Sequence, residues 1–206
     1  MNKNIGMGKH FIVCVGRQLG SGGRIIGNRM ADVFGIKFYD REVLDLAAQE
    51  SGFDKRLFEH TDEHKAGLRG LASRFTPLYT DSLSRESLFK FQSDAIRSAA
   101  EGASCVFVGR CADYVLRDFG DMVSVFITAN LADRIKRLAA LRGISEKDAK
   151  RECLKGDENR ATYYNYFSGK VWGSAASYDL CINSSVLGIE GTADVVEGFI
   201  KRKLGL

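Results

Sequence analysis

Residues 11–24 of the chain read FIVCVGRQLGSGGR, and this stretch decides the fold that the sequence predicts. Its first part, Phe11 to Val15, is a nearly continuous apolar run, which is typical of a strand buried on both faces. The glycine-rich turn after it leads at once into apolar residues at helical spacing, a pattern that ends at Gly35. A buried strand, a glycine turn and a helix in this order predict an α/β fold built on a parallel sheet.

Four further blocks have the same nearly continuous apolar character, and helical patterns separate them. They are Ile36 to Tyr39, Cys105 to Val108, Val123 to Thr128 and Leu180 to Asn183. In parallel sheets ligands bind beyond the carboxyl ends of the strands. We therefore expect the functional residues just after Val15, Tyr39, Val108 and Thr128.

Length and composition fit one globular domain. The chain has 206 residues, of which 45% are apolar and 27% charged. No run of about 18 uncharged apolar residues occurs, so the membrane-spanning class is excluded together with the disordered and collagen-like classes. The first ten residues, MNKNIGMGKH, lack the apolar centre of a secretory signal, and we expect a soluble cytoplasmic protein without a membrane partner.

Charge and cysteine content narrow the choice of ligands. The net charge of +4 suits an anionic small molecule and is far below the basic footprint of a nucleic-acid-binding domain. The five cysteines are scattered and include no C-x-x-C pair. We therefore expect reduced thiols, with neither a zinc site nor a disulfide framework.

Two stretches interrupt the alternation of strands and helices. Residues 53–85 hold the only proline, Pro77, and residues 130–170 are helical in pattern and rich in arginine. Both are expected to be insertions at the ligand edge of the sheet. His60 and His64 in the first stretch are interpreted as part of a solvated helix face, since no third metal ligand accompanies them.

The glycine-rich stretch from Gly16 to Arg24 is expected to bind phosphate. Glycines between a strand and a helix allow backbone amides to converge into a nest for phosphate oxygens, and the helix dipole adds to it. On this interpretation a valine at Gly22 abolishes nucleotide binding, because its side chain fills the space of the phosphate. The alternative that these glycines only form a tight turn between strand and helix, without binding a ligand, is also kept. A dinucleotide site, with Asp40 on the ribose, fits less well because Ile25 stands where a small residue is required.

The loop departs from the common phosphate loop G-x-x-x-x-G-K-[ST]. Counted from Gly16 the lysine position is Gly22, and counted from Arg17 it is Gly23, with Arg24 at the hydroxyl position. The lysine is therefore missing in both registers. Arg24 can bring a fixed positive charge to the same phosphates, although a planar guanidinium places its charge differently from an ammonium group.

Three further blocks, together with the loop, carry a resemblance to a known family. They are Phe38-Tyr39-Asp40-Arg41-Glu42, the stretch VFVGRCADY from Val106 to Tyr114, and the stretch YDLCINSS from Tyr178 to Ser185. With these blocks the chain resembles the cytidylate kinase-like family over nearly its whole length. It is more distantly similar to cytidylate kinases proper, whose third strand ends in Gly-Arg-Asp where this chain has Gly109-Arg110-Cys111.

The resemblance implies a single P-loop kinase domain over residues 1–206. Its implied fold is a three-layer α/β structure with a five-stranded parallel sheet and helices on both faces, a monophosphate-binding insertion near residues 41–100 and a lid near residues 143–170. The implied activity is transfer of the γ-phosphoryl group of ATP, with Mg²⁺, to a nucleoside monophosphate such as CMP. A kinase of another small molecule, a non-catalytic nucleotide-binding regulatory protein, a nucleic-acid binder and a homo-oligomer stay open.

The resemblance also implies roles for individual residues. Arg24, Arg110 and Arg160 are the candidate catalytic residues, and Arg160 arrives with the closing lid. The nucleotide-binding candidates are Gly20, Ser21, Gly22, Gly23, Arg24 and Arg134, with Ser21 as a ligand of Mg²⁺. The candidates for binding the phosphoryl acceptor are Asp40, Arg41, Arg110 and Asp157.

Structural roles stay open for several charged and aromatic residues. Arg41 can form an exposed ion pair with Asp45, and Asp40 can cap a helix. Most charges between residues 131 and 160 are expected to form a solvated helix face. The aromatic residues beyond them are expected to pack against the core rather than to stack on a base; they are Tyr163, Tyr164, Tyr166, Phe167 and Trp172.

Overall fold

The computed structural model describes residues 9–40 and 85–206. Contacts along the chain divide it into two units, residues 1–40 with 99–206 and residues 41–98. Arg41, His60, His64 and Pro77 lie outside the described residues, so the roles expected for them and for the monophosphate-binding insertion stay predictions.

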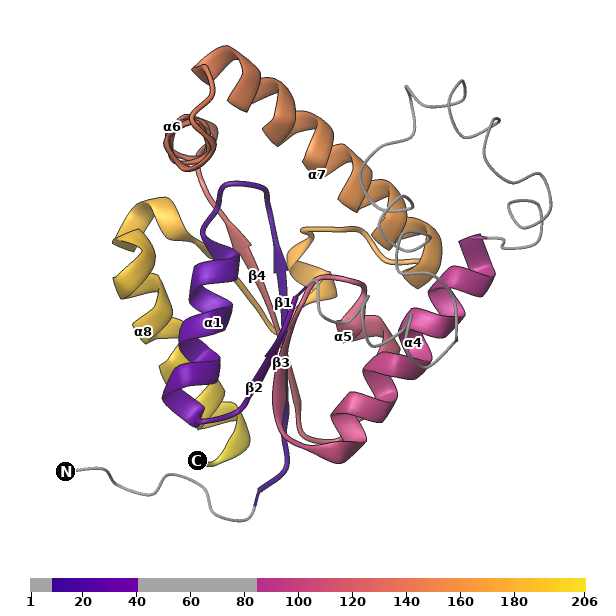
Figure 1. The fold of residues 1–206 in the computed structure, drawn as a ribbon. Helices are drawn as coiled ribbons and strands as arrows, with labels where there is room; N and C mark the ends of the chain where they lie inside the picture. Colours follow the sequence, from indigo (N-terminus) through magenta and orange to yellow (C-terminus); the bar gives the residue numbers. More distant parts are fainter. Residues whose placement is uncertain (1–8, 41–84) are drawn as a thin grey trace. The chain divides into compact units, whose positions relative to one another are not determined.

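A five-stranded parallel sheet forms the centre of the first unit (Figure 1). In the spatial order β2-β3-β1-β4-β5, its strands are Lys37–Tyr39 (β2), Cys105–Val108 (β3), Ile12–Arg17 (β1), Met122–Thr128 (β4) and Leu180–Asn183 (β5). All five predicted strands are confirmed, with ends displaced by at most two residues. Val13 of β1 pairs with Val106 on one side and Val123 on the other. The central strand therefore leads into the glycine loop at the middle of the carboxyl edge.

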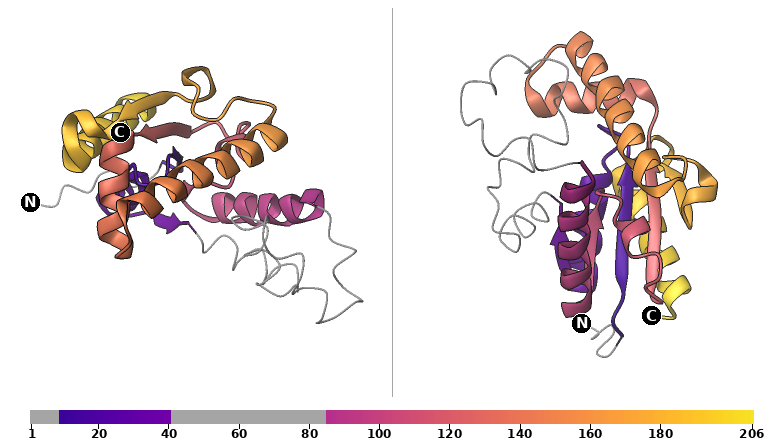
Figure 2. Two further views of the ribbon diagram at one scale, coloured as in Figure 1. Left: turned by 90° about the horizontal axis from the view of Figure 1, so that it is seen from above. Right: turned by 90° about the vertical axis from the view of Figure 1, so that its right-hand side faces the viewer.

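Helices cover both faces of this sheet. Those among the described residues are Gly23–Phe34 (α1), Arg85–Gly102 (α4), Ala112–Val115 (α5), Leu131–Arg142 (α6), Glu146–Ser168 (α7) and Ser184–Leu204 (α8). α1 and α8 pack against each other and against one face, and α5 contacts β1 and β4 from the other face. α6 and α7 pack against each other beside the carboxyl edge (Figure 2), so the helical character predicted for residues 130–170 is confirmed.

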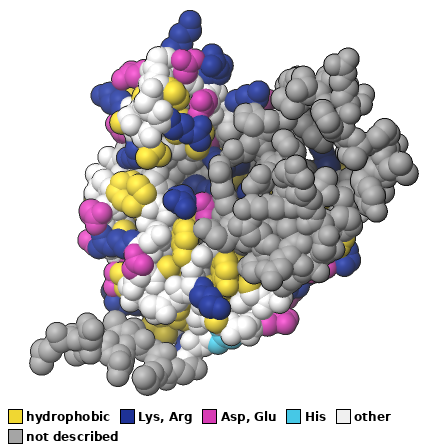
Figure 3. All heavy atoms as spheres, viewed as in Figure 1, with side chains coloured by type: hydrophobic (Ala, Val, Ile, Leu, Met, Phe, Trp, Pro, Cys, Tyr) yellow, Lys and Arg dark blue, Asp and Glu magenta, His cyan; other side chains and the backbone are white. Residues whose placement is uncertain are grey.

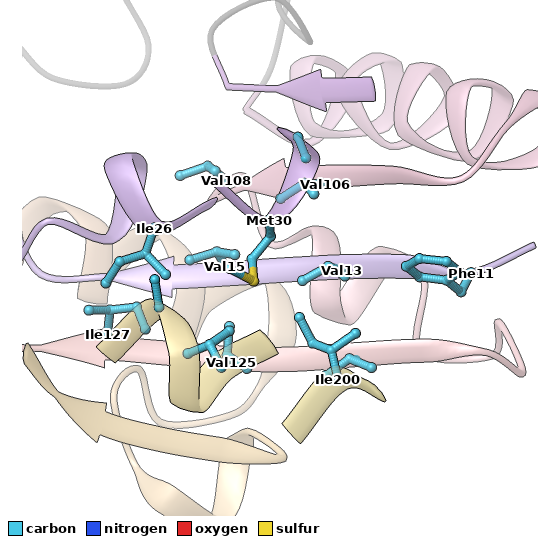
Figure 4. Packing of buried hydrophobic residues seen from close by; sticks show 14 of the residues in the cluster. Phe11, Val13, Val15, Ile26, Met30, Val106, Val108, Val125, Ile127 and Ile200 are labelled. Carbon is cyan, nitrogen blue, oxygen red and sulfur yellow. The ribbon is translucent and has the colours of Figure 1, made fainter. Parts of the chain in front are cut away.

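The hydrophobic core lies between the sheet and the pair of helices α1 and α8 (Figure 4). Val13 and Val15 of β1 are almost fully buried and form one cluster with Ile26 and Met30 of α1. Burial of an aliphatic side chain of this size stabilises a fold by about 1.5–3 kcal/mol. The end of β1, from which the glycine loop starts, is therefore firmly held.

Glycines mark both ends of α1. Gly22 is the N-cap with a φ of 84°, and Gly35 is the C-cap with a φ of 64°, both in the left-handed region. The amide of Ile36 donates to the carbonyl of Ala31 at 3.0 Å, which closes the helix as a Schellman motif does. The predicted end of this helix at Gly35 is confirmed.

The five cysteines are free thiols, as the sequence predicts. Burial raises the pKa of every one of these thiols, and that of Cys105 to about 12. They therefore stay protonated at neutral pH. In the part of the chain that the structure describes, every helix is too short or too polar to cross a lipid bilayer.

Candidate phosphate-binding site

The glycine loop, residues 16–24, joins the carboxyl end of β1 to the first turn of α1. Gly20 and Gly22 have φ values of 80° and 84°, a left-handed backbone that only glycine adopts without strain. Left-handed residues in such a turn direct neighbouring amides toward one concave side, which forms an anion nest. Within the described part of the chain, the amides of Gly20, Gly22 and Arg24 donate no hydrogen bond to protein atoms. These donors, with the helix dipole behind them, suit phosphate oxygens.

Ser21 faces inward and organises the loop. Its side chain is fully buried, and its hydroxyl donates to the carbonyl of Gln18 at 2.9 Å and accepts the amide of Gly23 at 3.4 Å. Its own carbonyl accepts the hydroxyl of Ser184 in α8 at 2.6 Å. These bonds hold the peptide groups at Ser21 away from the nest, so that the neighbouring amides are left for a ligand.

The expected contact of Ser21 with Mg²⁺ does not fit this arrangement. A buried hydroxyl that is engaged in two hydrogen bonds within the loop is not an open metal ligand. Among residues 9–40 and 85–206 there is also no cluster of His, Cys, Asp and Glu that could hold a metal ion. The role of Ser21 toward Mg²⁺ therefore stays a prediction, and the inward direction of its hydroxyl counts against it.

An arginine, an aspartate and a second arginine meet at the ends of β1 and β2. Asp40, buried directly after β2, accepts the Nε of Arg24 at 2.7 Å and an Nη of Arg17 at 3.5 Å. The Arg24 side chain is 67% exposed and also lies over the ring of Phe38, with 5.9 Å from its Cζ to the ring centroid. Two candidates from the sequence, Arg24 and Asp40, therefore contact each other. Their roles toward substrates stay predictions.

Sequence reasoning missed Arg17. It is the last residue of β1, and its side chain is only 19% exposed. The available signal was its place: a charged residue that ends the most apolar strand stands at the edge where ligands of parallel sheets bind.

The main chain of Leu19 is clamped by two further candidates. Asp157 of α7 accepts the Leu19 amide at 2.8 Å, and Arg134 of α6 donates to the Leu19 carbonyl at 3.3 Å. Arg134 and Asp157 also form an ion pair, and Arg134 is 5% exposed. The structure thus brings both residues to the loop, where they bind its backbone. Arg160 lies one turn along α7 from Asp157, at 3.9 Å between the charged groups.

The side chain of Leu19 completes this attachment. It packs into a small apolar cluster between α6 and α7, whose buried members are Leu138, Ala149 and Cys153. A Cβ at Gly156 of α7 would lie 3.0 Å from the Leu19 side chain, which shows how closely the helix approaches the loop. The helices α6 and α7 are therefore bound to the glycine loop through the half-buried Leu19 side chain and two charged residues, of which Asp157 lies in the predicted lid.

The structure adds a second reason for glycine at position 22 to the one that the sequence suggests. A Cβ at this position would lie 2.0 Å from the Cδ1 of Ile189 in α8, and its φ of 84° disfavours any larger residue. A valine would therefore strain the loop backbone and displace the end of the Ile189 side chain. The Gly22→Val protein tests loop conformation as well as phosphate space.

Arg110 stands in a strained turn directly after β3. Gly109, Arg110 and Cys111 have φ values of 83°, 61° and 55°, so three successive residues are left-handed. A non-glycine residue in this region costs about 1–3 kcal/mol and is found preferentially at functional sites. Burial raises the pKa of Tyr163 in α7, and the charge of Arg110 partly offsets this effect, which places the guanidinium near that ring.

The aromatic residues of α7 and the segment after it serve mainly as packing groups, as expected. Tyr164 is 4% exposed, and its hydroxyl donates to the buried carboxylate of Asp113 at 2.7 Å. Trp172 packs edge-on against Phe126 of β4 at 5.0 Å between ring centroids. Tyr166 differs, since it is 62% exposed.

Basic and acidic side chains are interspersed on the described part of the face that Figure 3 shows. Arg29, for example, pairs with Glu190 and Asp194, and Arg142 pairs with Glu152. Such local pairing is typical of a solvated surface.

The chain matches a known protein family and, over part of its length, a curated relative. Residues 12–186 match the cytidylate kinase-like family. A cytidylate kinase from Ignicoccus hospitalis is 28% identical over 98 residues, which are 48% of this chain and 56% of that protein. The chain therefore spans little more than half the length of this curated relative.

Solved structures agree on the fold. An uncharacterized protein from Eubacterium ventriosum has a TM-score of 0.71 at 26% identity, with 93% of this chain and 98% of that chain covered. A gluconokinase from Sinorhizobium meliloti has a TM-score of 0.56 at 11% identity, with 95% and 94% covered. A shikimate kinase from Bacteroides thetaiotaomicron has a TM-score of 0.54 at 13% identity, with 93% and 98% covered.

The five-stranded parallel sheet with helices on both faces, and its likeness to these kinase structures, define the class of protein: an α/β protein with the P-loop kinase fold. The predicted fold is thereby confirmed. Within this class, the chain belongs to the cytidylate kinase-like family, which confirms the resemblance that the sequence motifs carry.

Proposed function

We propose that the protein is an ATP-dependent phosphotransferase that transfers the γ-phosphoryl group of the Mg²⁺ complex of ATP to a nucleoside monophosphate in the cytoplasm. CMP is the first candidate acceptor. One observation carries the proposal: in a member of this family, the amides of Gly20, Gly22 and Arg24, at the start of α1 and directly after the central strand, donate no hydrogen bond to residues 9–40 or 85–206. The partial similarity to a cytidylate kinase supports the choice of acceptor.

The chemistry of phosphoryl transfer suits the residues at this edge. The reaction needs two anionic substrates held in line and their charge neutralised, with little covalent help from the protein. The loop amides bind the ATP phosphates in this scheme. Arg110, held in its turn after β3, binds the acceptor phosphate, and Arg160 of α7 contacts the transferring group. A guanidinium suits both tasks because it binds phosphate oxygens in pairs.

The acceptor is tested by incubating the protein with ATP, Mg²⁺ and single acceptors while ADP release is measured. The acceptors are CMP, UMP, AMP and GMP, with shikimate and gluconate added because kinases of these compounds share the fold. We expect ADP release that depends on a nucleoside monophosphate and is fastest with CMP. Release that depends only on shikimate or gluconate would identify a kinase of another small molecule.

A non-catalytic nucleotide-binding regulatory protein is the second candidate. It is favoured by Gly23 at the lysine position and Arg24 at the hydroxyl position, which leave the loop without two groups of the common phosphate loop. ATP binding without ADP release from any acceptor would support this candidate and contradict the kinase proposal.

A further inference from the structure

Position 23 has no room for the lysine that is missing. The helix α1 begins at Gly23, which selects the register counted from Arg17, with Gly23 at the lysine position. A Cβ at Gly23 would lie 2.5 Å from the Cβ of Arg17 and 3.1 Å from its Cγ. Real Cβ atoms do not approach other carbons so closely. The first atoms of the Arg17 side chain therefore occupy the space where a lysine side chain would start.

The guanidinium end of the Arg17 side chain lies against a second glycine, Gly109. A Cβ at Gly109 would lie 2.0 Å from an Nη of Arg17 and 3.0 Å from its Cζ. Gly109 directly follows β3, the neighbour of β1 in the sheet. The Arg17 side chain thus runs from the end of β1, past the first residue of α1, to the end of β3. Its charge lies at the carboxyl edge, beside the start of the helix that carries the open amides.

An ion pair helps to hold this charge in place. Asp40 is the carboxylate that pairs with Arg17, at 3.5 Å, which is at the outer limit of a hydrogen bond. The same carboxylate binds Arg24 more closely, at 2.7 Å. A guanidinium presents N–H donors on more than one edge, so it can contact a carboxylate and a phosphate together.

We propose that Arg17 supplies the phosphate-binding cation of the glycine loop, in place of the lysine that position 23 cannot carry. This inference rests on the proposed function, since it assigns a residue to the nucleotide phosphates. It explains why glycine stands at both 23 and 109, because each leaves space for one end of the Arg17 side chain.

The first test compares Arg17→Gln with wild-type protein in the binding of ATP and of adenosine, by isothermal titration calorimetry with Mg²⁺ present. Loss of a charge-assisted phosphate contact is expected to weaken ATP binding about 10- to 100-fold. Adenosine has no phosphate, so its affinity is expected to change less than about threefold. Arg29→Gln is the matched control, because Arg29 is an arginine of α1 that pairs with α8.

The second test moves the cation to the usual position. Gly23→Lys alone is expected to lose ATP binding, because its side chain collides with Arg17. In the double variant Arg17→Gly with Gly23→Lys the collision is absent, and ATP affinity is expected to exceed that of Arg17→Gly alone by about tenfold or more. Circular dichroism and thermal melting establish which variants are folded.

The outcomes separate this inference from the proposed function. A wild-type protein that binds no ATP overturns the proposed function and the role of Arg17 with it. A wild-type protein that binds ATP, together with a folded Arg17→Gln protein that binds it equally well, overturns the role of Arg17 alone. A folded double variant that binds ATP no better than Arg17→Gly also contradicts it.

Discussion

The buried carboxylate of Asp40 accepts hydrogen bonds from both Arg17 and Arg24. Because it is buried, we expect its substitution to lower stability. It is 7% exposed, and Arg17 is also largely buried. Removing the carboxylate charge takes away the ion pair of Asp40 with the largely buried Arg17 cation. We predict that Asp40→Asn lowers the free energy of unfolding by about 1–3 kcal/mol, measured by urea denaturation.

Asp194→Asn is the matched control for this substitution. Asp194 also pairs with an arginine, but its side chain is 65% exposed, and exposed ion pairs contribute about 0–1 kcal/mol. Equal losses of stability in the two variants would contradict the special role assigned to Asp40.

Arg110 allows strain and function to be separated at one position. Glycine adopts a φ of 61° without strain, whereas arginine does not. We predict that Arg110→Gly keeps or increases the free energy of unfolding but lowers kcat/KM for the acceptor by at least about tenfold, because the phosphate contact is lost. Steady-state kinetics with CMP and thermal melting measure the two effects. Unchanged kinetics would remove Arg110 from the acceptor site.

At the scale of elements, Leu19 connects the glycine loop to the helices α6 and α7. Leu19→Ala removes the side chain that fills their apolar cluster, at a cost of about 2 kcal/mol for a half-buried leucine. We predict faster amide hydrogen exchange in residues 131–168 and unchanged exchange in β1 and β4. Leu141→Ala is the control, since Leu141 of α6 is 80% exposed. Equal exchange in the Leu19→Ala and wild-type proteins would show that the helices dock without the leucine.

Elements with a local sequence signal were predicted well, and contacts between distant elements were not. The strand Cys105–Val108 was predicted to the residue, because a short apolar run between polar segments depends on its own composition. The end of α1 at Gly35 was predicted because a left-handed C-cap favours glycine. The clamp of Leu19 by Asp157 joins residues 138 positions apart, and no periodicity in the sequence reports such a pair.

In the candidate site, too, some residues were predicted from sequence motifs, whereas one was recognised only from contacts between distant residues. The resemblance marked Arg134 and Asp157 as functional, and the structure brings both to the loop, where they bind its backbone. Arg17 escaped notice because its one signal, its place at the carboxyl end of β1, does not show which way the side chain points. The role proposed for Arg17 depends on the space beside Gly23 and Gly109 that its side chain occupies, and only the packed structure shows this space.

At the scale of the whole molecule, the buried carboxyl of Asp113 makes stability depend on pH. Burial raises its pKa, and the hydrogen bond from Tyr164 offsets this effect only in part. A raised folded-state pKa means that the stability contribution of this group is fully present below the pKa of the unfolded chain, about 3.9, and is lost as pH rises through the folded-state value.

We predict that Asp113→Asn removes this pH dependence. The amide oxygen can still accept the Tyr164 hydroxyl, but no charge has to be buried at neutral pH. The variant is therefore expected to gain free energy of unfolding relative to wild type between pH 4.5 and pH 7, measured by urea denaturation across that interval. An identical pH profile in the two proteins would show that Asp113 does not titrate in this range.

The central claim is that backbone amides of the glycine loop hold the phosphates of a nucleotide. A crystal structure of the protein with ADP tests it most directly. The account predicts the β-phosphate within hydrogen-bond distance of the amides of Gly20 and Gly22, at the start of α1. ADP bound at another place, or a loop whose amides have turned to protein carbonyls in saturated crystals, would contradict it.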